Sequence, residues 1–164
     1  MKSLLIIGAG GYGQMVRELA DRSGYDTIDF LDDHLPGSAG TINDLEILQD
    51  RYDGCIIAIG DAEVRERIVE RVRNLVTIVH PSAVVSRSAQ IDNGCVIEAN
   101  TTINAHATIG KASFVCAGAV INHDAFVGKY CQIDCNAVVA SGAAVPDKTK
   151  VQSLSVWSER PENR

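Results

Sequence analysis

The chain has 164 residues, of which 46% are hydrophobic but only 5% aromatic, and it carries a net charge of −6. The acidic balance and the lack of a lysine- or arginine-rich cluster argue against nucleic acid as a partner. No apolar run approaches the roughly 18 residues of a membrane helix. Five cysteines without framework spacing predict reduced thiols in a cytoplasmic protein, and no Cys/His spacing predicts a metal site.

Residues 1–79 alternate between the patterns of buried strands and of amphipathic helices. Such an order predicts an α/β, Rossmann-like domain with a short parallel sheet and helices packed on it. The expected strands are 2–8, 25–31, 54–60 and 75–79, and the expected helices are 12–23, 43–49 and 63–72.

From residue 80 onward the chain has a period of six. Thirteen aliphatic side chains recur in register: Val79, Val85, Ile91, Ile97, Ile103, Ile109, Val115, Ile121, Val127, Ile133, Val139, Val145 and Val151. From Val85 onward, each follows a small side chain by two positions. This period predicts a hexapeptide β-helix over 80–152 with about four coils of 18 residues. Residues 153–164 are expected to form a tail.

The segment "IIGAGGYG" contains the pattern G-x-G-x-x-G as Gly8, Gly10 and Gly13, directly after a strand and at the start of a helix. These glycines allow backbone amides to approach a phosphate. Asp32 and Asp33 end the second strand, where an acidic residue can accept a hydrogen bond from a ribose or a base. A four-stranded sheet is too small for a dinucleotide site and favours a nucleotide diphosphate carrying a sugar. A glycine turn that binds nothing is the alternative.

The two halves together resemble the family of sugar O- and N-acyltransferases that includes sialic-acid O-acetyltransferases and UDP-4-amino-sugar N-acetyltransferases. The resemblance rests on "IIGAGGYGQMV", "FLDD", "IAIGDAEVRERI", "IVHPSAVV" and "VINHDAFVG", in that order. It implies a left-handed β-helix, a homotrimer, acetyl-CoA bound between neighbouring subunits, and a nucleotide sugar held by the N-terminal domain. By position it places the diphosphate along Gly8, Gly10, Gly11 and Tyr12, the nucleoside at Asp32 and Asp33, and Gly60 and Arg65 in the same pocket.

The resemblance also makes His123 the catalytic histidine and Asp124 the acidic residue that follows it. The chemistry of the pair supports this assignment independently, because acyl transfer from a thioester needs a base for the incoming amine or hydroxyl. Histidine titrates near neutrality, and a neighbouring carboxylate can fix its tautomer. The transfer is direct, without an acyl-enzyme. Stacking at 18 residues places His106 beneath Asp124 and Asn104 beneath Asn122, so a structural Asp124–His106 pair is the alternative.

Three positions are assigned to the coenzyme. Members of the family usually carry a second histidine nine positions after the catalytic one, where this chain has Gln132; on the next coil Ser141 and Gly142 stand where a glycine is usual. Taken with the His123–Asp124 pair and the glycine loop, the resemblance favours transfer of acetyl from acetyl-CoA to a UDP-4-amino-sugar or a related sugar, without a metal. The alternatives are an inactive nucleotide-sugar-binding trimer that has lost its coenzyme site, a nicotinamide oxidoreductase and a metal-dependent hydratase.

Overall fold

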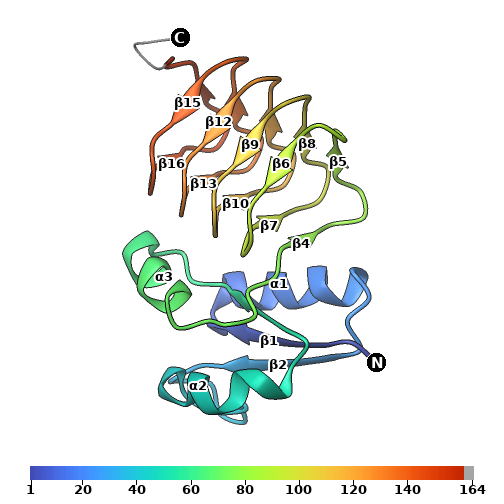
Figure 1. Cartoon of the computed structure of the whole chain (residues 1–164), viewed down its shortest axis with the longest axis vertical. Helices are drawn as coiled ribbons and strands as arrows, with labels where there is room; N and C mark the ends of the chain where they lie inside the picture. The colour runs from blue at the N-terminus through green and yellow to red at the C-terminus, as the bar shows by residue number, and fades with distance from the viewer. Residues whose placement is uncertain (161–164) are drawn as a thin grey trace.

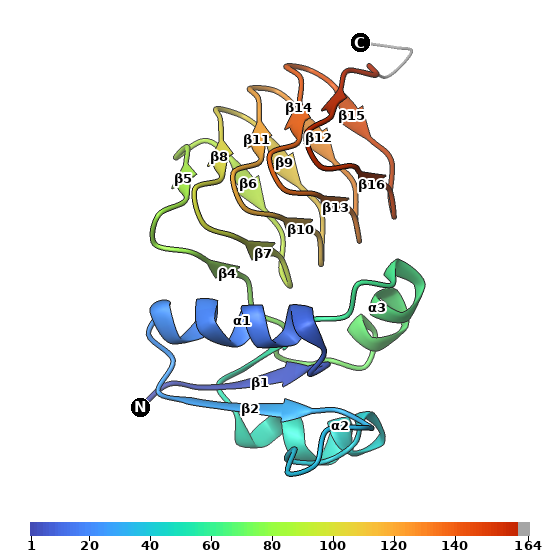
Figure 2. The ribbon, with the colours of Figure 1, turned by 180° about the vertical axis from the view of Figure 1, so that it is seen from behind.

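The computed structural model describes residues 1–160, in which an N-terminal α/β domain is joined to a parallel β-helix (Figure 1). Three parallel strands form the sheet of the N-terminal domain in the order β2-β1-β3. Seen from both sides, α1 lies between this sheet and the β-helix, and α2 lies beyond the sheet (Figure 2). The elements of the domain are β1 (Ser3–Ile7), α1 (Gly11–Arg22), β2 (Thr27–Leu31), η1 (Ile42–Asp44), α2 (Leu45–Leu48), η2 (Gln49–Arg51), β3 (Gly54–Ile57) and α3 (Ala62–Val69).

The β-helix has three faces, and every strand pairs in parallel with the strand one coil above or below it. The first face is β4 (Ile78–Val79), β7 (Val96–Ile97), β10 (Phe114–Val115), β13 (Gln132–Ile133) and β16 (Lys150–Val151). The second face is β5 (Val84–Val85), β8 (Thr102–Ile103), β11 (Val120–Ile121), β14 (Val138–Val139) and β17 (Val156–Trp157). The third face is β6 (Gln90–Ile91), β9 (Thr108–Ile109), β12 (Phe126–Val127) and β15 (Ala144–Val145).

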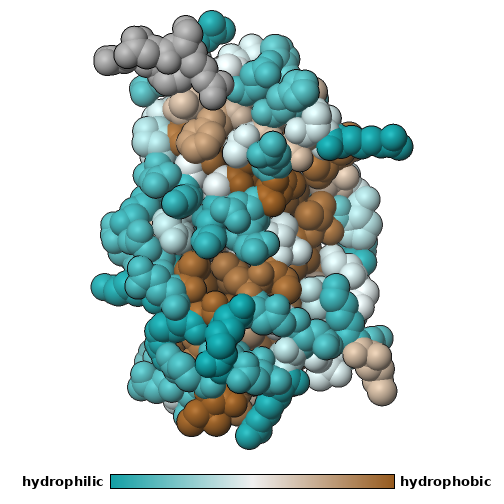
Figure 3. All heavy atoms as spheres, in the orientation of Figure 1, coloured by the Kyte–Doolittle hydropathy of each residue, from teal (hydrophilic) through white to brown (hydrophobic). Residues whose placement is uncertain are grey.

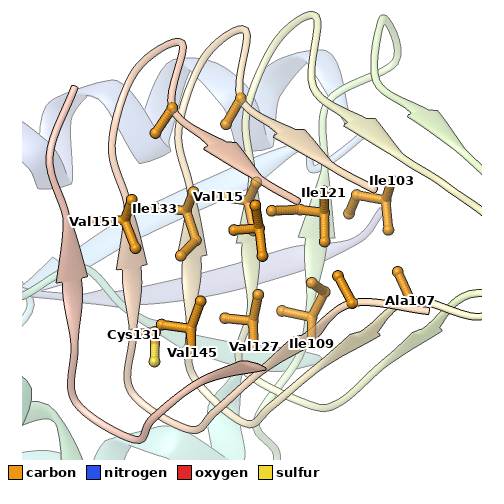
Figure 4. Packing of buried hydrophobic residues seen from close by; sticks show 14 of the residues in the cluster. Ile103, Ala107, Ile109, Val115, Ile121, Val127, Cys131, Ile133, Val145 and Val151 are labelled. Atoms are coloured by element: carbon orange, nitrogen blue, oxygen red, sulfur yellow. The ribbon is translucent and has the colours of Figure 1, made fainter. Parts of the chain in front are cut away.

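The six-residue period predicted the interior of the β-helix correctly from Ile97 onward. The aliphatic residue of each hexad points into the core, and Figure 4 shows rows from the three faces meeting there. The small residue two positions earlier is buried at each bend that leads into the strands from β7 to β15, as Ala107 and Ala125 illustrate. Val79 departs from the pattern and is 36% exposed, because the first coil has none beneath it.

Two sequence predictions about boundaries were wrong. Residues 75–79 do not form a fourth strand of the N-terminal sheet: Leu75 makes a single bridge to Cys55, and β4 pairs with β7 of the β-helix. At the other end, β17 pairs with β14 inside the segment predicted to be a tail. The rest of that predicted tail, 161–164, lies outside the described residues. The expected helix at 43–49 is divided into η1, α2 and the start of η2.

The N-terminal domain packs on the first face of the β-helix through a continuous apolar interface. Ile78, Val96 and Phe114 occupy the outward positions of that face, and all three are buried in one cluster with residues of α1 and β1. Hydrophobic surface is visible in Figure 3 near this junction and on the β-helix itself. The interface fixes how the glycine loop of one domain faces the coils of the other.

Candidate functional site

His123 and Asp124 lie at the bend between β11 and β12, where the chain passes from the second face to the third. His123 Nδ1 lies 2.8 Å from Asp124 Oδ2, and the two side chains are 62% and 55% exposed. An ionised carboxylate can only accept, so Nδ1 carries the hydrogen and, in the neutral ring, Nε2 has the free lone pair. The pair thus has the arrangement of an oriented general base.

The bends on neighbouring coils stack in the predicted register. Asn104 Nδ2 lies 3.4 Å from Asn122 Oδ1, and the Asp124 amide donates to Ala105 at 3.0 Å. Asp124 has a φ of 59°, in the left-handed region that aspartate tolerates better than most residues. This conformation turns the chain sharply and leaves the His123 side chain at the outer edge of the β-helix.

Ser141 and Gly142 lie one coil above His123 and Asp124. The Gly142 amide donates to the His123 carbonyl at 3.1 Å, and Gly142 has a φ of 68°. Gln132 is on β13, half a coil further along the chain, and its side chain donates to Asp134 at 3.1 Å. Within one subunit the structure therefore brings Ser141 and Gly142 to the His123 bend and leaves Gln132 on the opposite side of the coil.

The glycine loop leads from β1 into α1, and two of its glycines are required by close packing. A Cβ on Gly8 would come within 2.7 Å of Ile59 Cγ1, and a Cβ on Gly13 would collide with the Gly8 carbonyl. Gly10 and Gly11, by contrast, face open space. Because no side chain caps the start of α1 at Gly10, its first amides are available to an anion.

Asp32 and Asp33 both bind the backbone of their own domain. Asp32 accepts from the amides of Ala9, His34 and Leu35 at 2.8, 2.8 and 2.9 Å, and Asp33 accepts from Ile42 at 2.9 Å. The bond from Ala9, followed by the bond from His34, holds the pKa of Asp32 below its usual value. A cavity of about 340 Å³ lies nearby, lined in part by Arg17, Phe30 and 35–38. Contact of the two carboxylates with a nucleoside stays a prediction.

Tyr12 and Arg65, assigned to the nucleotide pocket by resemblance, lie instead between the two domains. The Tyr12 ring packs on Phe114 with centroids 4.6 Å apart, and burial raises the pKa of its hydroxyl well above the usual value, with smaller contributions from Cys116 and Glu98. Arg65 is only 1% exposed, and burial lowers its pKa. The enclosed Arg65 guanidinium does not agree with a direct contact to substrate. The Tyr12 side chain is packed between the domains, but the Tyr12 amide is one of the first of α1, so its contact with the diphosphate stays a prediction. Gly60, on the loop after β3, has open space at its Cβ position and stays a candidate.

The burial of Arg65 between the domains was not predicted, although the sequence contains a signal for it. Arg65, Ile68 and Val69 share the buried face of α3 at spacings of three and four residues. An arginine in that phase of an amphipathic helix predicts a buried guanidinium with several acceptors.

Known proteins are similar to this chain in both the N-terminal domain and the β-helix. The profile of the PglD N-terminal domain matches residues 3–72. UDP-N-acetylbacillosamine N-acetyltransferase from Bacillus subtilis (strain 168) is 34% identical over 115 residues, which are 60% of this chain and 52% of that protein. The match thus spans about half of that relative. GDP-perosamine N-acetyltransferase from Escherichia coli O157:H7 is 27% identical over 180 aligned positions, covering 97% of this chain and 79% of that protein.

Solved structures agree with these relatives. The acetyltransferase domain of PglB from Neisseria gonorrhoeae FA1090 matches with a TM-score of 0.77 and 25% identity, over 99% of this chain and 94% of that one. The same domain in complex with acetyl coenzyme A matches with a TM-score of 0.63 and 27% identity, over 92% and 95%. The matches support the predicted resemblance to the hexapeptide-repeat sugar acyltransferases, and the chain shares with the PglB domain a short α/β sheet followed by a parallel β-helix.

Within residues 1–160, no helix is long and apolar enough to cross a membrane. These residues also contain no group of three or more His, Cys, Asp and Glu side chains that could hold a metal ion.

Proposed function

We propose that this protein transfers acetyl from acetyl-CoA to the amino group of a nucleotide-linked 4-amino sugar. The observation that carries the proposal is the 2.8 Å His123–Asp124 contact at an exposed bend of the β-helix. The named relatives are N-acetyltransferases, which favours an amine over a hydroxyl as the acceptor. The nucleotide sugars in the names of these relatives carry UDP or GDP, so both nucleotides are candidates. Use of acetyl-CoA is consistent with the predicted cytoplasmic location.

In the proposed reaction the amine nitrogen attacks the thioester carbonyl, and His123 Nε2 takes the proton that the nitrogen loses. Asp124 holds the ring through Nδ1 and stabilises the imidazolium. The C–S bond then breaks, and the proton passes from His123 to the departing CoA sulfur. The histidine is neutral at the start and at the end, and no acyl-enzyme is needed because the amine attacks the thioester directly. Ser141 and Gly142 are the neighbouring positions proposed to contact the coenzyme, with Gln132 supplied from another subunit.

A homotrimer is proposed because the second face of the β-helix presents an apolar outer row to solvent. Val84 and Val156 at the ends of this row are 65% and 66% exposed. A largely apolar outward row on a rigid sheet is typical of an interface between subunits. The row consists of four valines, Val84, Val120, Val138 and Val156, and is interrupted by Thr102 after Val84. The bend that carries His123 follows β11 at the edge of this face, so a neighbouring subunit seated there would complete the acceptor groove.

Calorimetric titration of the protein with acetyl-CoA, alone and with a UDP- or GDP-4-amino sugar, tests the proposal. Micromolar binding of the coenzyme followed by turnover with one of the sugars is the expected result. Binding of a nucleotide sugar without any binding of acetyl-CoA would favour the inactive scaffold instead.

Gly10→Val is expected to weaken nucleotide-sugar binding by more than about tenfold, or about 1.4 kcal/mol, while acetyl-CoA binding is unchanged. Gly10 has a φ of −64°, which valine adopts, and its Cβ position is open, so the fold should persist. The added side chain would occupy the space in front of the first amides of α1. Titration with each ligand measures the two affinities. Loss of both would mean that the loop has only a structural role.

A further inference from the structure

Arg65 makes five hydrogen bonds, all of them to backbone carbonyl oxygens. Two remain within its own domain, where Nη1 donates to Ile59 and Gly60 at 2.7 and 3.1 Å. Three cross to the β-helix, where Nε donates to Ala112 at 2.8 Å and Nη2 donates to Tyr130 and Cys131 at 2.6 and 3.4 Å. Since a guanidinium has five N–H donors, none is left for a substrate.

The three carbonyls on the β-helix lie at the two ends of a single coil. Ala112 comes just before β10, and Tyr130 and Cys131 come just before β13. The chain between them makes one full turn, and His123 lies within that turn at the bend after β11. One buried cation therefore closes the ring of backbone that carries the His123–Asp124 pair.

The guanidinium also stacks on Phe114, the first residue of β10 in the same coil. Arg65 Cζ lies 4.1 Å from the centroid of the Phe114 ring, a cation–π distance. Phe114 in turn packs on Tyr12, which lies between Gly10 and Gly13 at the start of α1. Arg65 thus holds this coil through backbone carbonyls at both of its ends and through the Phe114 ring.

On its other side Arg65 fixes the loops assigned to the nucleotide. Its two bonds within the domain hold the carbonyls of Ile59 and Gly60, directly after β3. The close packing of Gly8 against Ile59 brings this loop to the glycine loop. A shift of Arg65 would therefore move the nucleotide loops and the His123 coil relative to each other.

We propose that Arg65 is a positioning residue for acyl transfer, which aligns the coil carrying His123 with the loops that hold the nucleotide sugar. The proposal rests on the function proposed above and adds a residue that touches neither substrate nor reacting atoms. Misplacement of about 1 Å between a base and its acceptor lowers the rate by about 100-fold, so a rigid clamp between the two sites is required.

Arg65→Met and Arg65→Lys test this role, with Lys148→Gln as the matched control. Methionine keeps an apolar stem without the donors, and lysine keeps the charge but cannot span carbonyls on both sides. Lys148 also joins α3 to the β-helix, through Glu63 at 3.1 Å and Glu66 at 2.7 Å, but it lies on the coil above the one that carries His123. Steady-state kinetics with acetyl-CoA and a UDP- or GDP-4-amino sugar give kcat and both KM values. Hydrogen exchange of the protein without ligands reports on the peptides covering 8–13 and 114–131.

The expected result for Arg65→Met is a fall in kcat of about 100-fold with a KM for acetyl-CoA within about twofold of wild type. Amide exchange should accelerate in 114–131 and in 8–13. Arg65→Lys should change in the same direction by less, and it decides the question by the same criteria if the methionine variant does not fold. Lys148→Gln should behave as wild type.

Wild-type kcat together with wild-type exchange in 114–131, in either Arg65 variant, would overturn the proposal. Equal effects in Lys148→Gln would overturn it as well, because the role would then belong to the interface in general. If the wild type transfers acetyl to neither sugar, the proposed function fails. Even with an inactive wild type, unchanged amide exchange in the Arg65 variants would overturn the proposal that Arg65 positions the His123 coil.

Discussion

His123→Asn is expected to lower kcat by about 100- to 10,000-fold, the usual contribution of a positioned general base. The asparagine has no atom that can take the proton of the attacking amine. The fold should be unaffected, because His123 is 62% exposed at a bend and lies outside the aliphatic core. Release of free CoA thiol measures the rate, and light scattering measures the assembly.

The same substitution at His80 is the matched control. His80 lies at a different bend of the β-helix, where its Nδ1 contacts Ser82 at 2.8 Å, and His80→Asn should keep wild-type kcat. Retained activity in His123→Asn would remove the assignment of the base. Lowered thermal stability in His106→Asn together with wild-type kcat in His123→Asn would support the alternative of a structural pair between Asp124 and His106.

The β-helix and the stacking of its bends could be predicted because both are repeated locally in the sequence. Each hexad contains its own inward aliphatic residue and small bend residue, so the core follows from the period alone. The same period places Gly142 above Asp124, as observed through the bond from Gly142 to His123. Contacts within one column of the β-helix therefore need no knowledge of other elements.

The contacts between the two domains could not be predicted in this way. Tyr12 and Arg65 meet Phe114 only because α1 and α3 pack on the first face of the β-helix, and no local pattern specifies that packing. A resemblance transferred by position assigned both residues to the substrate instead. The strand predicted at 75–79 failed for a related reason, since apolar residues there do not indicate which of the two sheets they will join.

A partial signal for the interface was nevertheless present. Ile78, Val96 and Phe114 are spaced by 18 residues at outward positions, where a solvated face would carry polar side chains. Apolar outward residues in one column predict a covered face. Together with the position of Arg65 on the buried face of α3, this column of apolar residues predicts that the N-terminal domain packs on the first face.

Ile121→Asp is expected to abolish folding of the β-helix. Ile121 is fully buried on β11, between Ile103 below and Val139 above, and Figure 4 shows its side chain pointing into the core. An unpaired carboxylate there costs several kcal/mol, on the order of the 5–15 kcal/mol by which a domain is stable. Circular dichroism with thermal melting should show loss of the cooperative transition.

The adjacent Val120→Asp separates burial from assembly. Val120 is on the same strand but points outward from the second face, in the middle of the row proposed to contact a second subunit. The introduced aspartate carboxylate remains hydrated in the monomer. The Val120→Asp protein should therefore melt cooperatively, while light scattering shows that the trimer has dissociated. A folded Ile121→Asp protein would mean that the aliphatic column is not the core on which the β-helix depends. A trimeric Val120→Asp protein would mean that the subunits meet through another face.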